Sequence, residues 1–341
     1  MKAVVVHGAG DLRVDVLPDP EPRGGEVLVA IEWGGICGSD VAYWRNGASG
    51  TAALKHPLVL GHEMAGRIAR TGPGVTDLEV GQPVTIHPAT HVGDDVLPDR
   101  LTGRTNLYPQ ISYCGSAAFD PHTDGGFSEL KVVRADQIRV LPEDLGTDHG
   151  ALAEPLAVAM HAVNRAGDVR GRDILVNGAG PIGSLVVAAA KYAGAATVTA
   201  SDVSEAPLNI AKAMGADAVI NVGAGGTLPV DVELVFEASG AAAALGSVLH
   251  ATARGGTLIQ VGNLSGSAVS AVLGDLVTRE ITWMGSYRFV DEITDAIAAM
   301  HDGLDVSPLI THRFAIDRAA EAIAVAAESG SSKVLLQLGG A

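Results

Sequence analysis

The chain has 341 residues, of which 47% are hydrophobic and 18% are charged. A chain of this length and apolar content buries a large core and is expected to divide into two domains, so an intrinsically disordered protein is excluded. The formal net charge of −16 disfavours nucleic acid and acidic membrane surfaces as partners, because both are polyanions. Small-molecule substrates remain open.

Two cysteines occur in the sequence, Cys37 and Cys114. This number excludes a disulfide framework and a cysteine-rich metal module, and it suits a reducing compartment. The N-terminal segment MKAVVVHGAG has an apolar run too short for a signal peptide. The uncharged stretch at 174–190 is interrupted by Pro and Gly, whereas a membrane span needs about 20 apolar residues. We therefore expect a cytoplasmic protein without a membrane segment.

The first 150 residues carry short β-type runs separated by Gly, Pro and Asp, which predicts a β-rich domain. The expected strands are Ala3–Val6, Val27–Glu32, Glu63–Ala69, Pro83–His87 and Glu129–Val133. The segment from Pro88 to Tyr113 follows no periodicity and is long for a structureless connection. It is expected to be a functional lobe or a mobile loop.

After Pro155, helical and strand patterns alternate, which is typical of a parallel sheet covered by helices. The expected helices are 156–167 and 184–195, and the expected strands are 173–177, 197–202, 234–240 and 256–262. Two further helices and a closing strand at 333–338 are predicted in the tail. The sequence thus predicts an α/β protein in which residues 151–286 form a doubly wound parallel sheet. Residues 1–150, completed by 287–341, are expected to form the β-rich domain.

A glycine-rich turn follows the predicted strand 173–177. Gly178, Gly180 and Gly183 form a GxGxxG pattern, in which the glycines permit a tight turn, close approach of a pyrophosphate, and packing of helix on strand. At the end of the next strand, Asp202 can accept hydrogen bonds from the adenosine ribose. This context predicts a Rossmann dinucleotide-binding domain. Because a carboxylate repels a 2′-phosphate and residues 203–207 supply no Arg or Lys, NAD is favoured over NADP.

Four candidate metal ligands lie in or next to the β-rich half: Cys37, His62, Glu63 and Glu154. A thiolate, an imidazole and a carboxylate are the ligands that a tetrahedral catalytic zinc takes, with one position left open. Taken separately, each residue also has a structural interpretation. Cys37 would be a small buried hydrophobe, His62 a core histidine, Glu63 a strand residue, and Glu154 an acid at a helix N-terminus.

The motifs GGICGSD, VLGHE, DGGF, LAEPLAVAMHA, NGAGPIGSL and VGNL occur in this order across nearly the whole chain. Together they resemble the zinc-dependent medium-chain alcohol and polyol dehydrogenase family, in particular its sorbitol dehydrogenase branch. IHP at 86–88, GSAAFDPHTDGGF at 115–127 and GSYRF at 285–289 are most similar to L-idonate 5-dehydrogenase. The resemblance implies a GroES-like catalytic domain and oxidation of a secondary alcohol of a polyol or sugar acid to the ketone, with zinc and NAD.

The resemblance also implies roles for individual residues. Cys37 and His62 match zinc ligands, while one of Glu63 and Glu154 ligates the metal and the other holds or replaces its water. Ser39 would hydrogen-bond the developing alkoxide. The cofactor-binding residues would be Gly178, Gly180, Pro181, Ile182, Gly183, Asp202 and Val261. The expected substrate residues are Tyr43, Arg288 and His122, with a packing aromatic, a surface ion pair and a plain loop histidine as the respective alternatives.

Two departures from the family pattern affect these expectations. Relatives usually carry a structural zinc on four cysteines, but residues 88–113 contain none, so this second zinc is predicted to be absent. A substitute site made by His87, His91, Asp94 and Asp95 is the alternative. Relatives also often have a relay histidine where this chain has Ala42. The proton would then leave through Ser39 and ordered water, or through Glu154 and the water on the zinc.

The expected partners are a small polyol or aldonate and further copies of the chain, as a homodimer or homotetramer, with no nucleic acid and no membrane. A sorbitol or xylitol dehydrogenase is the alternative with the nearest chemistry. A zinc-free reductase of the quinone reductase kind is disfavoured by the four ligand residues. The missing cysteines and relay histidine leave a third alternative, a catalytically inactive NAD-binding regulatory or structural protein.

Overall fold

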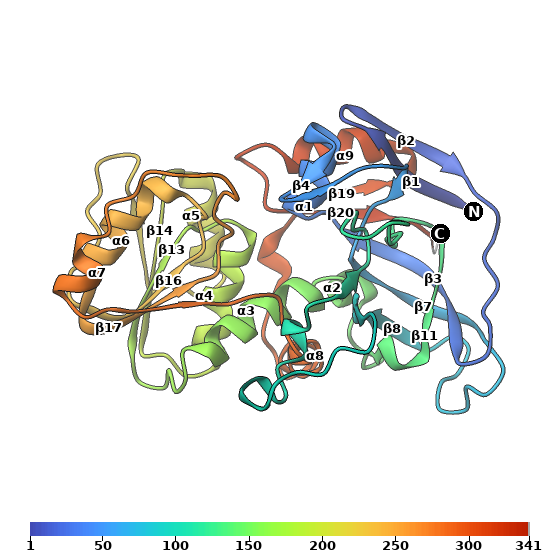
Figure 1. The fold of residues 1–341 in the computed structure, drawn as a ribbon, viewed down its shortest axis with the longest axis horizontal. Coiled ribbons are helices and arrows are strands. Elements are labelled where there is room, and N and C mark those ends of the chain that lie inside the picture. Colours follow the sequence, from blue (N-terminus) through green and yellow to red (C-terminus); the bar gives the residue numbers. More distant parts are fainter. Residues whose placement is uncertain (340–341) are drawn as a thin grey trace. The chain divides into compact units, whose positions relative to one another are not determined.

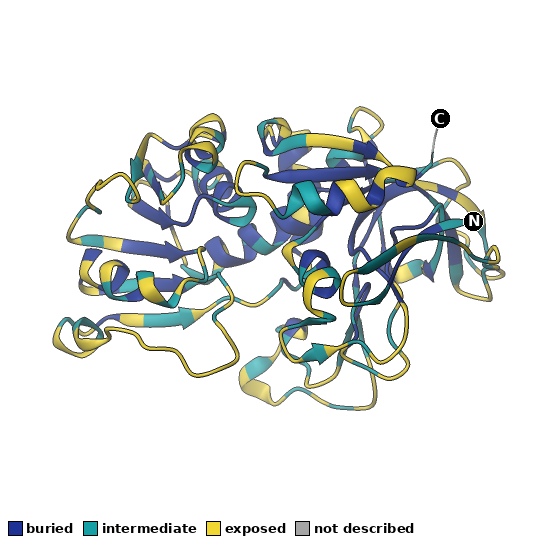
Figure 2. Cartoon of the chain, turned by 90° about the horizontal axis from the view of Figure 1, so that it is seen from above, coloured by how far each residue is buried: buried dark blue, intermediate teal, exposed yellow. Residues whose placement is uncertain are grey.

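The computed structural model describes residues 1–339, and its internal contacts divide the chain into two units (Figure 1). The first unit comprises Met1–Glu154 and Ile310–Ala341, and the second comprises Pro155–Leu309. In both units the central strands are buried and the connecting loops are exposed (Figure 2). Within the described residues, none of the helices has the length and apolar character that a membrane crossing requires.

The first unit is built on a seven-stranded sheet with the order β12-β8-β7-β3-β20-β19, in which β11 also pairs with β3. Its strands are β3 (Glu26–Gly35), β7 (Glu63–Thr71), β8 (Pro83–Ile86), β11 (Leu130–Arg134), β12 (Ile138–Val140), β19 (Ile310–Ala315) and β20 (Lys333–Gln337). A second sheet, in the order β2-β1-β6, contains β1 (Lys2–Gly8), β2 (Asp11–Val16) and β6 (Leu58–Val59). The predicted β-rich half is therefore confirmed, because each expected strand overlaps an observed one.

Short elements complete this unit. They are the helices α1 (Gly38–Asn46), α2 (Thr147–Gly150) and α9 (Ala319–Ala326), the start of α3 (Ala153–Arg165), the 3-10 turns η1 (Asp99–Leu101), η2 (Thr105–Leu107), η3 (Ala135–Gln137) and η6 (Ile316–Arg318), and the strand pairs β4 (Ala48–Ser49) with β5 (Ala52–Ala53) and β9 (Ala89–His91) with β10 (Ile111–Tyr113). The segment 88–113 thus forms a lobe of two paired strands with two helical turns between them. Inside it, the rings of His91 and Tyr108 stack at 3.8 Å.

The register of β3 on β7 brings two of the sequence motifs together. These strands are antiparallel, and Gly35 in GGICGSD lies opposite Glu63 in LGHE. A Cβ atom on Gly35 would lie 2.2 Å from Glu63 Oε2, which is far inside van der Waals contact. Glycine is required at this position so that the buried glutamate can occupy the space.

The second unit is a six-stranded parallel sheet in the order β15-β14-β13-β16-β17-β18. Its strands are β13 (Asp173–Asn177), β14 (Thr197–Asp202), β15 (Ala218–Asn221), β16 (Val232–Glu237), β17 (Thr252–Gln260) and β18 (Thr282–Gly285). Its helical elements are α3, α4 (Pro181–Tyr192), α5 (Glu205–Ala213), η4 (Ala242–Ala244), α6 (Leu245–Ala251), α7 (Gly274–Thr278), α8 (Glu292–His301) and η5 (Ser307–Leu309). The chain starts at the centre, winds outward through β15, and then returns to β16 on the other side. This is the doubly wound dinucleotide-binding order, so the predicted Rossmann fold is confirmed.

The two contact units differ in their bounds from the expected domains. Residues 151–154 belong to the first unit, and residues 287–309 belong to the second unit rather than completing the β-rich domain. Helix α8 contacts α3 within the second unit, where the carboxylate of Glu292, the first residue of α8, lies 2.7 Å from His161 Nδ1. A buried polar contact of this kind cannot be read from an apolar helical pattern.

Candidate active site

Three of the four predicted ligands converge in the first unit. Cys37, His62 and Glu63 each offer one ligand atom, and these atoms all lie within 4.8 Å of one another. A thiolate, an imidazole and a carboxylate at this spacing fit a zinc ion. Burial lowers the pKa of His62, but the neighbouring Cys37 outweighs this effect, and the net pKa lies well above its usual range. Across residues 1–339 no other group of three such side chains has its ligand atoms within 4.8 Å of one another.

Asp40 connects the segments that carry two of these ligands. Its Oδ2 accepts the backbone N–H of Cys37 at 2.9 Å, and its Oδ1 accepts that of Gly61 at 3.2 Å. The Asp40 side chain is fully buried, and this burial raises its pKa. Cys37 is therefore held at the start of α1, and His62 follows a residue tied to the same carboxylate. Asp40 belongs to the GGICGSD motif, but its role depends on a contact between distant segments.

Glu63 forms a buried ion pair that sequence reasoning missed. Lys333 Nζ, at the start of β20, donates to both carboxylate oxygens at 2.7 and 2.6 Å and to the carbonyl of Ile36 at 3.2 Å. The two side chains are only 3% and 1% exposed. Burial alone would lower the pKa of Lys333, but the adjacent Glu63 raises it overall. Because the partners are far apart in the chain and Lys333 lies in an apolar strand, no local signal could have paired them.

Glu154 occupies a different environment in the first turn of α3. Tyr113 Oη donates to Glu154 Oε1 at 2.5 Å, and the Tyr113 ring packs edge-on against His62 with centroids 5.6 Å apart. Burial raises the pKa of Glu154. This glutamate is not part of the group of three ligand atoms. Tyr113, which the sequence did not suggest, thus links the fourth predicted ligand to the cluster.

Tyr43 and His122 both make contacts with backbone inside the first unit. Tyr43 is 3% exposed, lies in the hydrophobic core, and accepts the N–H of Ala117 at 2.9 Å. His122 Nδ1 lies 2.9 Å from the carbonyl of Phe119, and its Nε2 accepts the N–H groups of Lys55 and His56 at 2.8 and 3.2 Å. These contacts fit the structural interpretation of both residues. Ser39 lies half-buried in the first turn of α1.

Arg288 belongs to the second unit. Its guanidinium lies 4.9 Å from the centroid of the Tyr287 ring, and its backbone adopts a positive φ of 51°. A non-glycine residue in this conformation stores strain of about 1–3 kcal/mol, and such residues occur preferentially at functional sites.

The glycine-rich turn of the second unit fits a dinucleotide phosphate. Gly178 has a φ of +94°, and a Cβ there would lie 2.5 Å from the Ser239 nitrogen, while one on Gly183 would lie 1.7 Å from the Gly178 carbonyl oxygen. By contrast, a Cβ on Gly180 would meet no atom within 4 Å. The first and third glycines are thus required by packing, and the second leaves open space beside the N-terminus of α4, which begins at Pro181.

Two further predicted cofactor residues, Asp202 and Val261, lie at the carboxyl ends of β14 and β17 in the same parallel sheet. Asp202 ends β14, and its two oxygens accept the N–H groups of Ala179 and Ser204 at 2.8 and 3.0 Å. The glycine loop and the acidic residue are thereby fixed to each other. Val261 follows β17 and donates its N–H to the Glu237 carbonyl at 2.8 Å.

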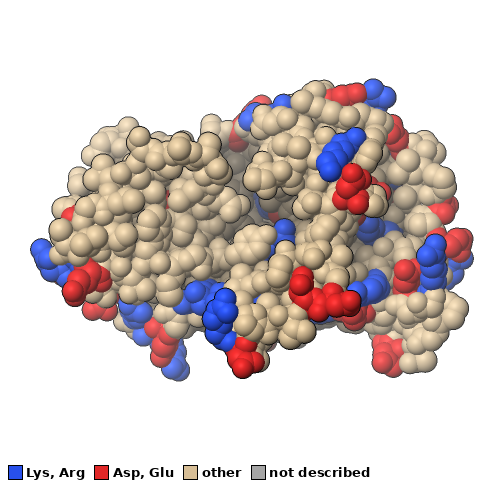
Figure 3. Space-filling model, viewed as in Figure 1, with Lys and Arg blue, Asp and Glu red and all other residues tan. Residues whose placement is uncertain are grey.

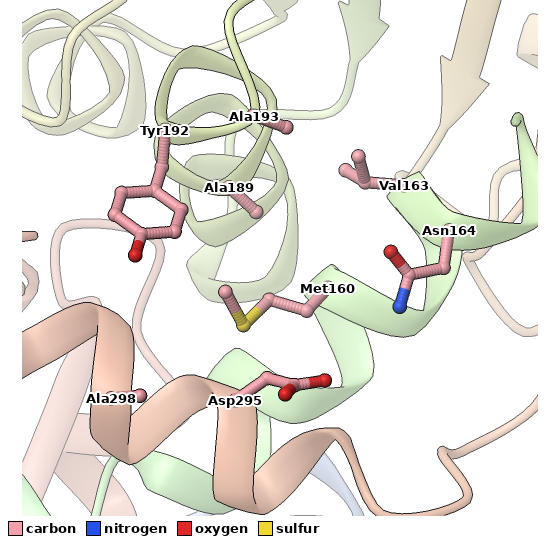
Figure 4. A pocket seen from close by; sticks show the side chains of 8 residues that line it. All are labelled: Met160, Val163, Asn164, Ala189, Tyr192, Ala193, Asp295 and Ala298. Atoms are coloured by element: carbon pink, nitrogen blue, oxygen red, sulfur yellow. The ribbon is translucent and has the colours of Figure 1, made fainter. Parts of the chain in front are cut away.

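A separate cavity of about 300 Å³ lies between α3, α4 and α8 of the second unit (Figure 4). It is lined by Met160, Val163, Asn164, Ala189, Tyr192, Ala193, Asp295 and Ala298. Its lining is mostly apolar and includes none of the predicted site residues.

On the molecular face shown in Figure 3, acidic and basic side chains are interspersed.

Comparisons with known proteins show the family to which the chain is related. Residues 23–143 match the alcohol dehydrogenase GroES-like domain, and residues 181–302 match the zinc-binding dehydrogenase domain. Sorbitol dehydrogenase of Gallus gallus is 37% identical over 98% of this chain and 96% of its own length. The crystal structure of L-idonate 5-dehydrogenase from Escherichia coli superposes with a TM-score of 0.92 at 32% identity, covering 98% of this chain and 97% of the other. A dehydrogenase from Sinorhizobium meliloti bound to NADP gives a TM-score of 0.88 at 31% identity, with 98% of each chain covered.

The chain therefore belongs to the zinc-dependent medium-chain dehydrogenase family, as the motifs predicted. Within that family it is a zinc- and NAD(P)-dependent alcohol dehydrogenase of the polyol and alcohol dehydrogenase group.

Proposed function

We propose that this enzyme oxidises a secondary alcohol of a polyol or sugar acid to the ketone, as L-idonate 5-dehydrogenase does, with transfer of hydride to NAD. The observation that carries the proposal is the convergence of Cys37, His62 and Glu63 in a chain that also has the dinucleotide fold. When bound, the zinc supplies Lewis acidity that lowers the pKa of the substrate hydroxyl. The fold around the glycine-rich turn orients the cofactor that receives the hydride.

Cys37, His62 and Glu63 are the proposed zinc ligands, and Glu154 is proposed to orient the remaining position. Two observations support these different roles. The ligand atoms of Cys37, His62 and Glu63 lie within 4.8 Å of one another, and Glu154 accepts a hydrogen bond from Tyr113. Lys333 fixes the Glu63 carboxylate in one orientation. Ser39, beside Cys37 at the start of α1, would accept the proton of the substrate hydroxyl and pass it to water, since Ala42 cannot.

The central experiment is a panel of polyols and aldonates followed by NADH absorbance, with and without a chelator. We expect turnover of at least one aldonate or polyol, lost on chelation and restored by zinc. Metal analysis should give about one zinc per chain, since the four cysteines of a second site are lacking. Chelator-insensitive turnover would favour a zinc-free reductase, and dinucleotide binding without turnover of any substrate would favour a regulatory protein.

Arg288 is the proposed recognition residue for an acidic substrate. Its positive φ supports a functional role rather than that of a surface ion pair. A guanidinium can bind a carboxylate through two parallel hydrogen bonds. Arg288→Ala should raise KM for an aldonate much more than for a neutral polyol. Equal effects would point to the second candidate, a sorbitol or xylitol dehydrogenase, which the 37% identity to sorbitol dehydrogenase favours. Tyr43 and His122 are also proposed to line the substrate pocket, in addition to the contacts that their polar atoms make with backbone.

NAD is the proposed cofactor in preference to NADP. The carboxylate of Asp202, fixed by two backbone N–H groups, would repel a 2′-phosphate. Comparing kcat/KM for NAD and NADP tests this directly, and a preference for NADP would overturn it.

We also propose that the enzyme is a homodimer or homotetramer. The support is β18 at the edge of the parallel sheet together with the exposed apolar side chains of Val269, Val272 and Val277 nearby in sequence. Sedimentation of the wild-type protein and of Val272→Lys tests this, since a monomeric wild type would contradict it.

The proposed location is the cytoplasm, supported by the two free cysteines, and cell fractionation would test it.

A further inference from the structure

Glu237 is a buried carboxylate for which the proposed reaction has no role. It ends β16 and is 0% exposed. Strand β16 pairs with β13 on one side and β17 on the other. Glu237 therefore lies at the point where the strand order reverses, which is where doubly wound sheets bind their ligands.

Five hydrogen bonds converge on this side chain. Asn177 Nδ2 donates at 3.2 Å, the N–H groups of Ser239 and Gly240 at 2.9 and 3.2 Å, and Gln260 Nε2 at 2.5 Å, and the Ser239 hydroxyl donates as well. The donors come from the ends of β13 and β17 and from the loop after β16. Glu237 thus connects the ends of three strands at the point where the strand order reverses.

The orientation of these groups identifies Glu237 as an acceptor only. Asn177 Oδ1 accepts from the Ser201 hydroxyl at 3.0 Å, which turns the Asn177 amide nitrogen toward Glu237. Ser239 Oγ accepts the N–H of Ala241 at 3.1 Å, so its own proton points to the carboxylate. Each of the five groups that contact the carboxylate therefore donates to it, and none of them offers an acceptor for a carboxyl proton.

The negative charge of Glu237 has no counter-ion among the residues that the structure describes. All five of its partners are neutral amides, a hydroxyl and backbone N–H groups. An uncompensated buried charge acts over a longer range than a surface charge, because solvent screens it less. A cation bound near the carboxyl end of β16 would therefore be attracted by the charge of Glu237.

The topology indicates which half of the dinucleotide lies on this side. Asp202, the expected ribose-binding acid, ends β14 on one side of β13, and the pyrophosphate belongs at the glycine-rich turn after β13. The nicotinamide half must then extend across the switch point, toward the ends of β16 and β17. The oxidised nicotinamide ring carries a positive charge and the reduced ring carries none.

We propose that the buried charge of Glu237 shifts the relative affinity of this site toward the oxidised dinucleotide and away from the reduced one. The inference rests on the proposed dinucleotide binding and goes beyond it. Adenosine and pyrophosphate are the same in both forms, so their interaction with Glu237 cancels when the two affinities are compared. The ratio of the two dissociation constants isolates the effect of the ring charge.

The test is to measure Kd for NADH by fluorescence and Kd for NAD by competition, in the wild type and in Glu237→Gln. Glutamine keeps the shape of the side chain and removes its charge. We expect Kd of NAD to rise relative to Kd of NADH by about threefold to tenfold. The matched control is Glu233→Gln, which removes a charge from the exposed, opposite end of the same strand and should leave the ratio unchanged.

Two further variants separate charge from packing. Glu237→Asp keeps the charge but loosens the hydrogen bonds, so both affinities should fall while their ratio stays at the wild-type value. Gln260→Lys leaves Glu237 in place and brings a cation to the position from which Nε2 now donates. It should shift the ratio in the same direction as Glu237→Gln, and it serves as the test if that variant does not fold.

The outcomes are distinct. A ratio that moves in Glu237→Gln or Gln260→Lys but not in Glu237→Asp or Glu233→Gln supports the proposal. An unchanged ratio in both charge-neutralising variants, or an equal shift in Glu237→Asp, overturns it while leaving the proposed function intact. A wild-type protein that binds neither NAD nor NADH overturns both.

Discussion

Two fully buried glutamates, one in each unit, solve the same electrostatic problem in different ways. Glu63 in the first unit has a buried lysine on both of its oxygens. Glu237 in the second unit is held by neutral donors alone. An ion pair cancels most of the electric field of the carboxylate. Neutral donors stabilise the negative charge but do not neutralise it, so a nearby ligand still experiences a negative potential. The comparison teaches that burial and hydrogen bonding alone do not tell what a carboxylate presents to a ligand.

The largest expected effect comes from breaking the ion pair. Lys333→Met leaves Glu63 buried without its cation, which should lower the free energy of unfolding by about 3–5 kcal/mol. Urea denaturation of the metal-free protein measures this. The control is Lys2→Met, whose partner Asp317 is exposed and which should change stability by no more than about 1 kcal/mol. If the two variants are equally stable, Glu63 does not depend on Lys333.

A second test concerns Asp40, a buried carboxylate of the first unit that is bonded to backbone N–H groups, as Glu237 is. In Asp40→Asn the amide NH₂ must face the N–H of either Cys37 or Gly61, and the loops that carry Cys37 and His62 should shift. We expect zinc affinity to fall by about 10–100-fold, measured by chelator competition. Asp124→Asn, which removes an exposed carboxylate bonded to the Val59 N–H, should bind zinc as tightly as the wild type. Equal affinity in Asp40→Asn would show that the ligands are positioned without it.

The smallest expected effect concerns Glu292, a largely buried carboxylate of the second unit that contacts His161. Burial would raise its pKa, but His161 and the N–H of Val290 outweigh burial and lower it to about 2. Since an unfolded glutamate titrates near 4.3, its contribution to stability is complete above about pH 5 and is lost as the pH falls toward 2. Urea midpoints at several pH values should therefore fall less steeply on acidification in Glu292→Gln than in the wild type. The exposed Glu328→Gln should retain the wild-type slope, and an unchanged slope in Glu292→Gln would refute the assignment.

Local patterns predicted most of the fold. The alternation of strand and helix after Pro155, the glycine spacing from Gly178 to Gly183, and the short β runs of the first half each reflect a physical constraint that acts over a few residues. The Rossmann order and the β-rich sheet follow from them. The contact units differ from the expected boundary at residue 286, and the hydrogen bond between α3 and α8 within the second unit is not encoded by any periodicity.

The same limit applies to the site. The count of two cysteines excluded a four-cysteine zinc site, because that statement concerns composition, whereas Cys37 was identified as a candidate ligand by its motif GGICGSD. The motifs further identified His62, Glu63 and Glu154 as candidate ligands. Only the tertiary structure distinguishes the two glutamates. Glu63 pairs with Lys333 and belongs to the group of three ligand atoms, whereas Glu154 is hydrogen-bonded to Tyr113 and lies outside that group. Strand register and chain reversal bring these partners together from distant parts of the chain, and a residue's charge environment is set by what surrounds it in space.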